Sequence, residues 1–429
     1  MKRHQRDRLV ATICGLAVIA ATGCASTQPS TTPSTTPSTA PSTVEDSTPS
    51  LTYATQGRHA VGYREFTTAG AQQQPLTLRA WYPAARPDDE QPVTISYTAL
   101  NKFGEQITPG KEITAVGGAL ADGQPEQAGG PYPLVVFSHG FSLSPIVYST
   151  LAEHYASQGY VVLAPEHNES FDGSLTEFWK ELIDRPVDIQ RTIDYAELLN
   201  TPGELLAGLI DLDNLAVVGH SYGGYTALAA AGARFDFAAY KTRCAALTAD
   251  DPLNFFCAPV PNESDMAMRA GLDEVPSDLW PSFGDPRVTS AISLAGDAYF
   301  FDERGLAELE VPIMSMGGTV DEGTPYAWGA KLTYDHVGSE DKTLVSFPGA
   351  GHFLFVDPCE NLPWVENSVY RDAICTDAVW DTHRPLDIVK HYTTAFLRDT
   401  LDADPEARAT LTGQQPDLDN VEYTTTNNP

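Results

Sequence analysis

The stretch "NLAVVGHSYGGYTALAAA", residues 214–231, constrains the fold more than any other part of the chain. An apolar, β-branched run ends at "GHSYG", and an alanine-rich run with high helix propensity follows at once. A strand can turn into a helix this abruptly only where side chains are absent, and Gly219 and Gly223 meet that need. The stretch therefore predicts a buried strand, a tight turn that lifts Ser221 clear of the sheet, and a helix.

The same alternation extends along the chain. Residues 57–68 and 76–83 favour an opening antiparallel pair, and helices are expected over 144–159, 185–200 and 385–401. Further strands are expected at 132–142, 160–167, 215–220, 288–296, 311–318 and 342–349. Alternating strands and helices predict the α/β class, with a mostly parallel sheet covered by helices on both faces.

Two segments, 232–286 and 355–384, interrupt this alternation, and each contains two cysteines. An oxidising compartment permits disulfides, and four cysteines allow three connectivities. Proximity favours two pairs, Cys244 with Cys257 and Cys359 with Cys375. C-x-x-C spacing is absent, which disfavours a metal site. We expect 232–286 to be a disulfide-containing insertion or cap whose aromatic residues pack a small subdomain, with lining of an acyl pocket as the alternative.

The first residues have the features of an export signal. A basic start, an apolar region of about 14 residues and small residues precede Cys24, and "ATGC" resembles a bacterial lipobox. We expect a lipoprotein signal peptide over 1–23 and a lipid on Cys24, with ordinary cleavage that leaves this thiol free as the alternative. The Ser/Thr/Pro-rich segment that follows, up to residue 50, predicts a disordered tether. The expected location is the bacterial cell envelope, periplasm-facing or at the cell surface.

Charge limits the partners. The chain carries 57 acidic and 26 basic residues, a formal net charge of −31. A surface of that sign repels a phosphate backbone, so nucleic acid is not an expected partner. We expect a folded domain over 51–405 and a C-terminal tail over 406–429.

Ser221 needs a base to become a nucleophile, and His352 lies just beyond the last expected strand, where such a base is expected. Two aspartates could orient the imidazole, because both follow strands that end at the same sheet edge. Asp321, in "GGTVDEGTP", is favoured, and Asp297 in "AGDAYFF" is the alternative. The expected oxyanion donors are the N–H groups of Tyr222 and Phe141. His139 and His220 are expected to pack the neighbouring turns.

Three stretches carry a family resemblance: "PLVVFSHGFSLSPIVYSTLAEHYASQGYVVLAPEHNES", "RPVDIQRTIDYAELLN" and "LAVVGHSYGGYTALAAA". Over residues 58–400 the chain resembles the platelet-activating-factor acetylhydrolase and dienelactone-hydrolase-like branch of the α/β-hydrolase superfamily. The resemblance implies Ser221 as nucleophile and His352 as base. The resemblance leaves the acid open. Asp297 is similar in position to the acid of the acetylhydrolases, and Asp321 resembles the commoner acid position after the following strand. Dienelactone hydrolases use a cysteine nucleophile, whereas this chain has serine.

These observations predict an exported serine ester hydrolase that acts on small-molecule or lipid esters, of short-chain acyl or phospholipid-acetyl type, without a cofactor or metal. A lipase or polyester hydrolase is the alternative within that class. A non-catalytic surface lipoprotein that binds a ligand is the alternative outside it.

Overall fold

The computed structural model describes residues 51–86, 93–169, 175–248, 250–381, 383–413, 415, 418 and 420–426. The expected signal peptide, Cys24 and the tether therefore lie outside the described residues. Within the described ranges, every helix is too short or too polar to cross a membrane.

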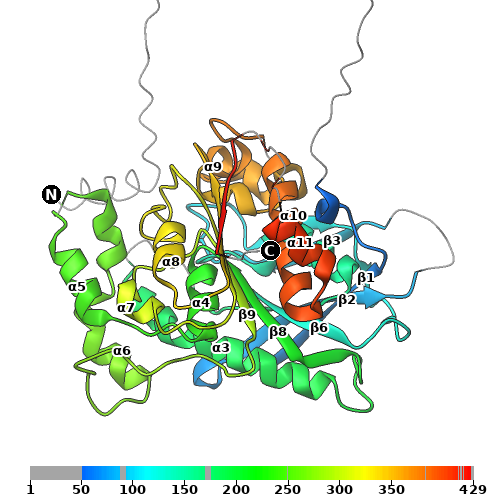
Figure 1. The fold of residues 1–429 in the computed structure, drawn as a ribbon, viewed down its shortest axis with the longest axis horizontal. Coiled ribbons are helices and arrows are strands. Elements are labelled where there is room, and N and C mark those ends of the chain that lie inside the picture. The colour runs from blue at the N-terminus through cyan, green and yellow to red at the C-terminus, as the bar shows by residue number, and fades with distance from the viewer. Residues whose placement is uncertain are drawn as a thin grey trace, which may run out of the picture. The chain divides into compact units, whose positions relative to one another are not determined.

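A ten-stranded sheet forms the centre of the domain, in the order β12-β11-β10-β9-β8-β6-β7-β2-β1-β5 (Figure 1). The strands from β11 to β7 run parallel, whereas β12, β2 and β1 each pair antiparallel with a neighbour. A separate two-stranded sheet joins β3 and β4. The bounds are β1 Ala60–Ala69, β2 Pro75–Ala84, β3 Ile95–Leu100, β4 Glu112–Gly117, β5 Leu120–Ala121, β6 Tyr132–Ser138, β7 Val161–Glu166, β8 Ile210–His220, β9 Ser290–Leu294, β10 Ile313–Gly318, β11 Lys342–Phe347 and β12 Glu422–Thr425.

Helices cover both faces of the large sheet. On β6, Val135 and Phe137 pack with α2 and α10, while Leu134 and Val136 belong to the core under α3 and α4. Both faces are buried, which is why the central strands read as continuous apolar runs. The predicted α/β-hydrolase fold is confirmed. The helices are α2 Ser149–Gln158, α3 Phe178–Leu199, α4 Tyr222–Ala231, α5 Phe237–Ala245, α6 Glu263–Arg269, α7 Asp302–Leu306, α8 Ala330–His336, α9 Arg371–Cys375, α10 Arg384–Asp402 and α11 Pro405–Thr412.

Helix α3 begins earlier than the expected 185–200, and it contains Pro186. A proline inside a helix has no N–H to donate to the carbonyl four residues before it, here that of Leu182. The hydroxyl of Tyr225 on α4 donates to this carbonyl instead, over 2.5 Å. The proline is therefore accommodated by packing between helices, which the local sequence does not show.

Most aromatic residues of the insertion 232–286 are buried, whereas Phe255 is exposed. Phe235 and Trp280 are buried in the same apolar cluster as Tyr225 of α4, and Figure 1 shows α5, α6 and α7 grouped at the side of the domain away from β1 and β2. A disulfide joins Cys244 to Cys257 within it, and the S–S distance is 2.00 Å.

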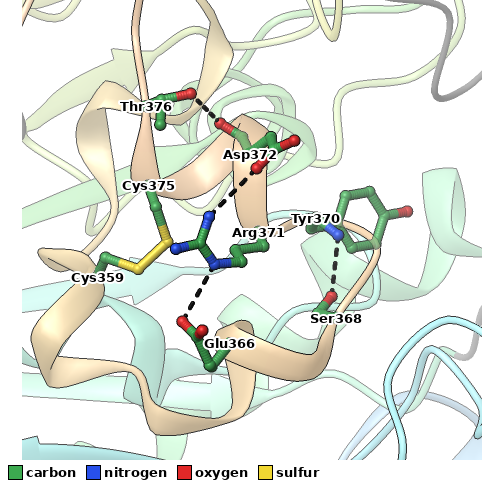
Figure 2. The surroundings of a disulfide bond; sticks show 8 residues. All are labelled: Cys359, Glu366, Ser368, Tyr370, Arg371, Asp372, Cys375 and Thr376. Carbon is green, nitrogen blue, oxygen red and sulfur yellow. Dashed lines mark hydrogen bonds and ion pairs between the residues drawn. A yellow bond between two sulfur atoms is a disulfide. The ribbon is translucent and has the colours of Figure 1, made fainter.

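A second disulfide joins Cys359 to Cys375, so both pairings favoured by proximity are confirmed. Figure 2 shows Arg371 beside it, between Glu366 and Asp372. The segment closed by this disulfide leads to Asp377, whose Oδ2 accepts the N–H of Gly351 over 2.9 Å. It thus supports the turn that carries His352.

The residues expected as a C-terminal tail are partly structured. Helix α11 packs on α10, and β12 pairs antiparallel with β11 through four residues. Strand β12, "EYTT", lies in a polar region and lacks the apolar signal by which a strand is found in a sequence.

Candidate active site

Ser221 stands on a strained turn between β8 and α4. Its backbone has φ 57° and ψ −124°, a conformation that side chains rarely adopt. A Cβ added to Gly219 would lie 2.0 Å from the carbonyl oxygen of Gly223, and one added to Gly223 would lie 2.0 Å from that of Ser138. The two glycines are therefore required by close backbone approach, as predicted from their spacing.

His352 lies in the turn after β11 and contacts Ser221. Its Nε2 is 2.8 Å from Ser221 Oγ, and its Nδ1 is 2.8 Å from Oδ2 of Asp321, in the loop after β10. The Asp321 carboxylate accepts, so Nδ1 carries the hydrogen and Nε2 is free to accept the serine proton. The side chains of His352 and Asp321 are only 10% and 1% exposed, which keeps water from competing for these hydrogen bonds.

Asp297, the alternative acid, is hydrogen-bonded to Thr324 and not to His352. Thr324 Oγ1 donates to Asp297 Oδ1 over 2.8 Å, while Thr324 N–H donates to Asp321 Oδ1 over 2.7 Å. Of the two candidate acids, Asp321 is therefore the one hydrogen-bonded to the imidazole. Burial raises the pKa of Asp297 to about 7, although the Thr324 hydroxyl and His352 oppose that rise.

The His352 imidazole is tuned by the same neighbours. Burial by itself lowers the pKa of His352, because it penalises the charged form. The charge of Asp321 and its hydrogen bond outweigh burial, and the pKa of His352 is raised above the ordinary 6.5. The arrangement favours an imidazolium once His352 has taken a proton.

The two expected oxyanion donors belong to α4 and to the loop after β6. Tyr222 is the first residue of α4, and the ring of Phe141 lies 5.9 Å from the Tyr222 ring, between centroids. Among the described residues, the backbone N–H groups of Phe141 and Tyr222 have no hydrogen-bond acceptor. The oxyanion role of these two N–H groups therefore stays a prediction.

Known proteins resemble parts of this chain. The Chlorophyllase family matches residues 106–258. Platelet-activating factor acetylhydrolase of Canis lupus familiaris is 26% identical over 204 residues, 36% of this chain and 46% of the relative. The Gallus gallus acetylhydrolase is 30% identical over 154 residues, 32% and 35% of the two chains. Esterase YjfP of Escherichia coli strain K12 is 37% identical over 105 residues, 23% and 39% of the two chains.

The chain has the α/β-hydrolase fold. The matches support its resemblance to the platelet-activating-factor acetylhydrolase-like branch, in addition to the fold described above. The alignments with these three relatives span less than half of each relative's length.

A buried chain of hydrogen bonds joins the loop after β6 to the turn that carries His352. The Gly140 N–H donates to the Tyr148 hydroxyl over 3.1 Å, and that hydroxyl lies 2.8 Å from His220 Nδ1. His220 Nε2 lies 3.0 Å from the carbonyl oxygen of His352, to which it must donate. Burial lowers the pKa of His220 well below 6.5, so the ring is neutral. His220 therefore packs the turn, as expected, and links the Gly140 loop to the backbone of His352.

Sequence reasoning missed the roles of Tyr148 and Thr324. Tyr148 precedes α2 and resembles any buried tyrosine, and no spacing rule connects it to His220. Thr324 was visible in "DEGTP", but only the fold brings it against Asp297. No group of three or more potential metal ligands occurs in the part of the chain that the structure describes.

Proposed function

We propose that this protein is a serine hydrolase that cleaves carboxylic esters. The observation that carries the proposal is the hydrogen-bonded series Ser221 Oγ, His352 Nε2, His352 Nδ1 and Asp321 Oδ2, with 2.8 Å at both contacts, at a strand-to-helix turn. The relatives named acetylhydrolases and an esterase support ester chemistry. A purely ligand-binding protein has no need of a nucleophile, a base and an orienting carboxylate in this order.

In the proposed reaction, Ser221 Oγ attacks the ester carbonyl carbon while its proton passes to His352 Nε2. The carbonyl oxygen becomes an oxyanion, which the N–H groups of Tyr222 and Phe141 stabilise. The bond to the alcohol oxygen then breaks, and His352 returns the proton to the leaving alcohol. His352 next deprotonates a water that attacks the acyl-enzyme, which releases the acid and restores Ser221.

The proposed substrates are esters with short acyl chains, the phospholipid acetyl ester among them. The names of the relatives support this choice. Hydrolysis of p-nitrophenyl esters of graded chain length tests it, and we expect kcat/KM to be highest for acetate or butyrate. A maximum at long chains, or release of acids from a polyester film, would instead favour the lipase or polyester hydrolase alternative.

A fluorophosphonate probe tests the nucleophile directly. We expect it to label the wild type and Ser282→Ala, which changes a serine of the insertion, and not to label Ser221→Ala. Turnover in Ser221→Ala should fall by several orders of magnitude while the thermal transition remains. Labelling that persists in Ser221→Ala would reject the assignment.

We further propose export and lipid attachment at Cys24, on the strength of "AATGC" after the short apolar run. The wild type should partition into detergent and incorporate labelled fatty acid. Cys24→Ser should be unprocessed or should leave the detergent phase, and an unchanged partition would reject the lipid anchor.

A further inference from the structure

Arg185 is a fully buried cation beside residues 139–142, the loop after β6, which we call the Phe141 loop. Its Nη1 donates to the carbonyl oxygen of His139 over 2.5 Å, and its Nη2 to that of Gly140 over 3.3 Å. The guanidinium also forms an ion pair with the buried carboxylate of Glu169. One planar guanidinium thus donates hydrogen bonds to two successive backbone carbonyls. The single ammonium of lysine cannot reproduce this geometry.

His139 binds the same Gly140 carbonyl. Its Nδ1 lies 2.7 Å from the Gly140 oxygen, which can only accept, so Nδ1 carries a hydrogen. Its Nε2 accepts the backbone N–H of His167 over 3.0 Å, so Nε2 carries none. Burial, with Lys102 and Arg185 nearby, lowers the pKa of His139 well below 6.5. The ring is therefore neutral with one fixed tautomer, and it donates steadily to Gly140.

These two donors determine where the next N–H points. The Gly140 carbonyl and the Phe141 N–H belong to one planar trans peptide, in which they point in opposite directions. Because Arg185 and His139 hold the carbonyl from one side, the N–H must face the other. Within the described residues this N–H has no protein acceptor.

Glu169 holds the residue on the far side of Phe141. Its Oε1 accepts the N–H of Ser142 over 3.2 Å, and Ser142 has φ 56°, a left-handed conformation that costs free energy in a serine. Burial by itself raises the pKa of Glu169, but the charges of Arg185 and Lys102, the Arg185 hydrogen bond and His167 together outweigh it, so the net shift of the pKa is downward and the carboxylate stays ionised. The Arg185–Glu169 pair therefore fixes the backbone on both sides of Phe141.

We propose that Arg185 and His139 are positioning residues that fix the Gly140–Phe141 peptide, so that the Phe141 N–H receives the oxyanion. This inference rests on the proposed ester hydrolysis. A buried ion pair is a weak stabiliser compared with apolar packing of the same volume, so stability alone does not account for this one. Removing an oxyanion donor costs about 10²–10³ in kcat in a well-studied protease, which sets the upper limit for a misplaced one.

Arg185→Lys removes the paired guanidinium hydrogen bonds to His139 and Gly140 but keeps a positive charge opposite Glu169. We expect kcat for p-nitrophenyl acetate to fall roughly 10- to 100-fold, below the limit for a lost donor, while KM changes little. Affinity for a trifluoromethyl ketone, whose adduct carries an oxyanion, should fall in parallel. The midpoint of the pH profile, which reports His352, should not move.

Arg234→Lys is the matched control. Arg234 also donates to two carbonyls, those of Trp280 and Leu279, and pairs with a glutamate, but it lies outside the Phe141 loop. We expect this variant to lose stability without losing kcat or affinity for the ketone.

His139→Asn and His139→Gln provide a second test that does not need Arg185 variants to fold. In His139→Asn the amide nitrogen takes the place of His139 Nδ1 and can donate to the Gly140 carbonyl. In His139→Gln the amide nitrogen takes the place of Nε2, so the donor to Gly140 is lost. We expect Asn to retain more kcat than Gln, whatever their order in Tm.

Full kcat and full ketone affinity in folded Arg185→Lys would overturn the proposal, as would equal kcat in the two His139 variants. A wild type that neither hydrolyses the ester nor reacts with a fluorophosphonate would overturn the proposed function itself, and this inference with it.

Discussion

The charge on His352 decides when Ser221 can be activated, because only the neutral imidazole accepts a proton. Asp321 raises the pKa of His352 above 6.5, so the imidazole stays protonated to a higher pH than a free one. We expect kcat/KM to fall as the pH is lowered through a midpoint above 6.5 and to level off at higher pH. Initial rates in overlapping buffers measure this midpoint. A rate that is flat from pH 5 to 8 would contradict the assignment of the base.

The two aspartates should differ sharply in mutants. Asp321→Asn removes the acceptor of the Nδ1 hydrogen and favours the wrong tautomer, a loss on the order of 10⁴ in kcat in the serine-protease example. Asp297→Asn keeps an oxygen that can accept from Thr324 Oγ1, so we expect a mild effect. Single-turnover acylation by the two folded variants compares them. The reverse order would assign the acid to Asp297.

Spacing along the chain was enough to propose Ser221, His352 and two candidate acids, because each follows a recognisable strand. The sequence favoured Asp321, but both loops open at the same sheet edge, so only side-chain distances show which carboxylate contacts the imidazole. Arg185 could not be found in this way. It lies in the middle of a helix, and its role comes from carbonyls about 45 residues away, which only tertiary packing brings to it.

At the scale of elements, we expect both disulfides to contribute to stability but only Cys359–Cys375 to contribute to the catalytic rate. Each closes a loop with a sequence separation of 13 or 16 residues, worth about 3 kcal/mol in the chain-entropy estimate. We expect Cys244→Ser/Cys257→Ser to lower Tm with little change in kcat. Cys359→Ser/Cys375→Ser should lower both, because its segment supports the His352 turn through Asp377. Calorimetry and ester hydrolysis on the two double variants test this, and equal kcat in both would contradict it.

The central strands could be predicted from their apolar runs, and β1 and β2 from their alternation, whereas β3, β4 and β12 could not. Most of β6 and β7 and the second half of β8, residues 215–220, are buried on both faces, so these stretches are largely apolar in sequence. Among the described residues, β3 and β4 pair only with each other, and most of their positions are not buried. Strand β12 has only Tyr423 to pack against the core. Their pairing depends on partners distant in sequence, which a local pattern does not reveal.

For the whole molecule, the net charge of −31 predicts a dependence of stability on salt. Like charges repel across the compact state, and the Debye length shortens from about 30 Å at 0.01 M to about 3 Å at 1 M ionic strength. We therefore expect Tm to rise by a few degrees as NaCl is raised over this range at pH 7. A fall in Tm would mean that attractive pairs, such as Arg287 with Asp285 and Glu197, outweigh the repulsion.

Strand β12 protects the edge of the sheet. Its four residues occupy hydrogen-bonding groups of β11 that would otherwise face solvent as a template for a neighbouring molecule. At the other edge, β5 is only two residues long and offers little for another strand to extend. Loss of residues 422–425 by proteolysis would thus leave a ready surface for chain-to-chain strand addition, next to the strand that leads to His352. Clipping at that end would appear first as self-association, before any change in the chemistry.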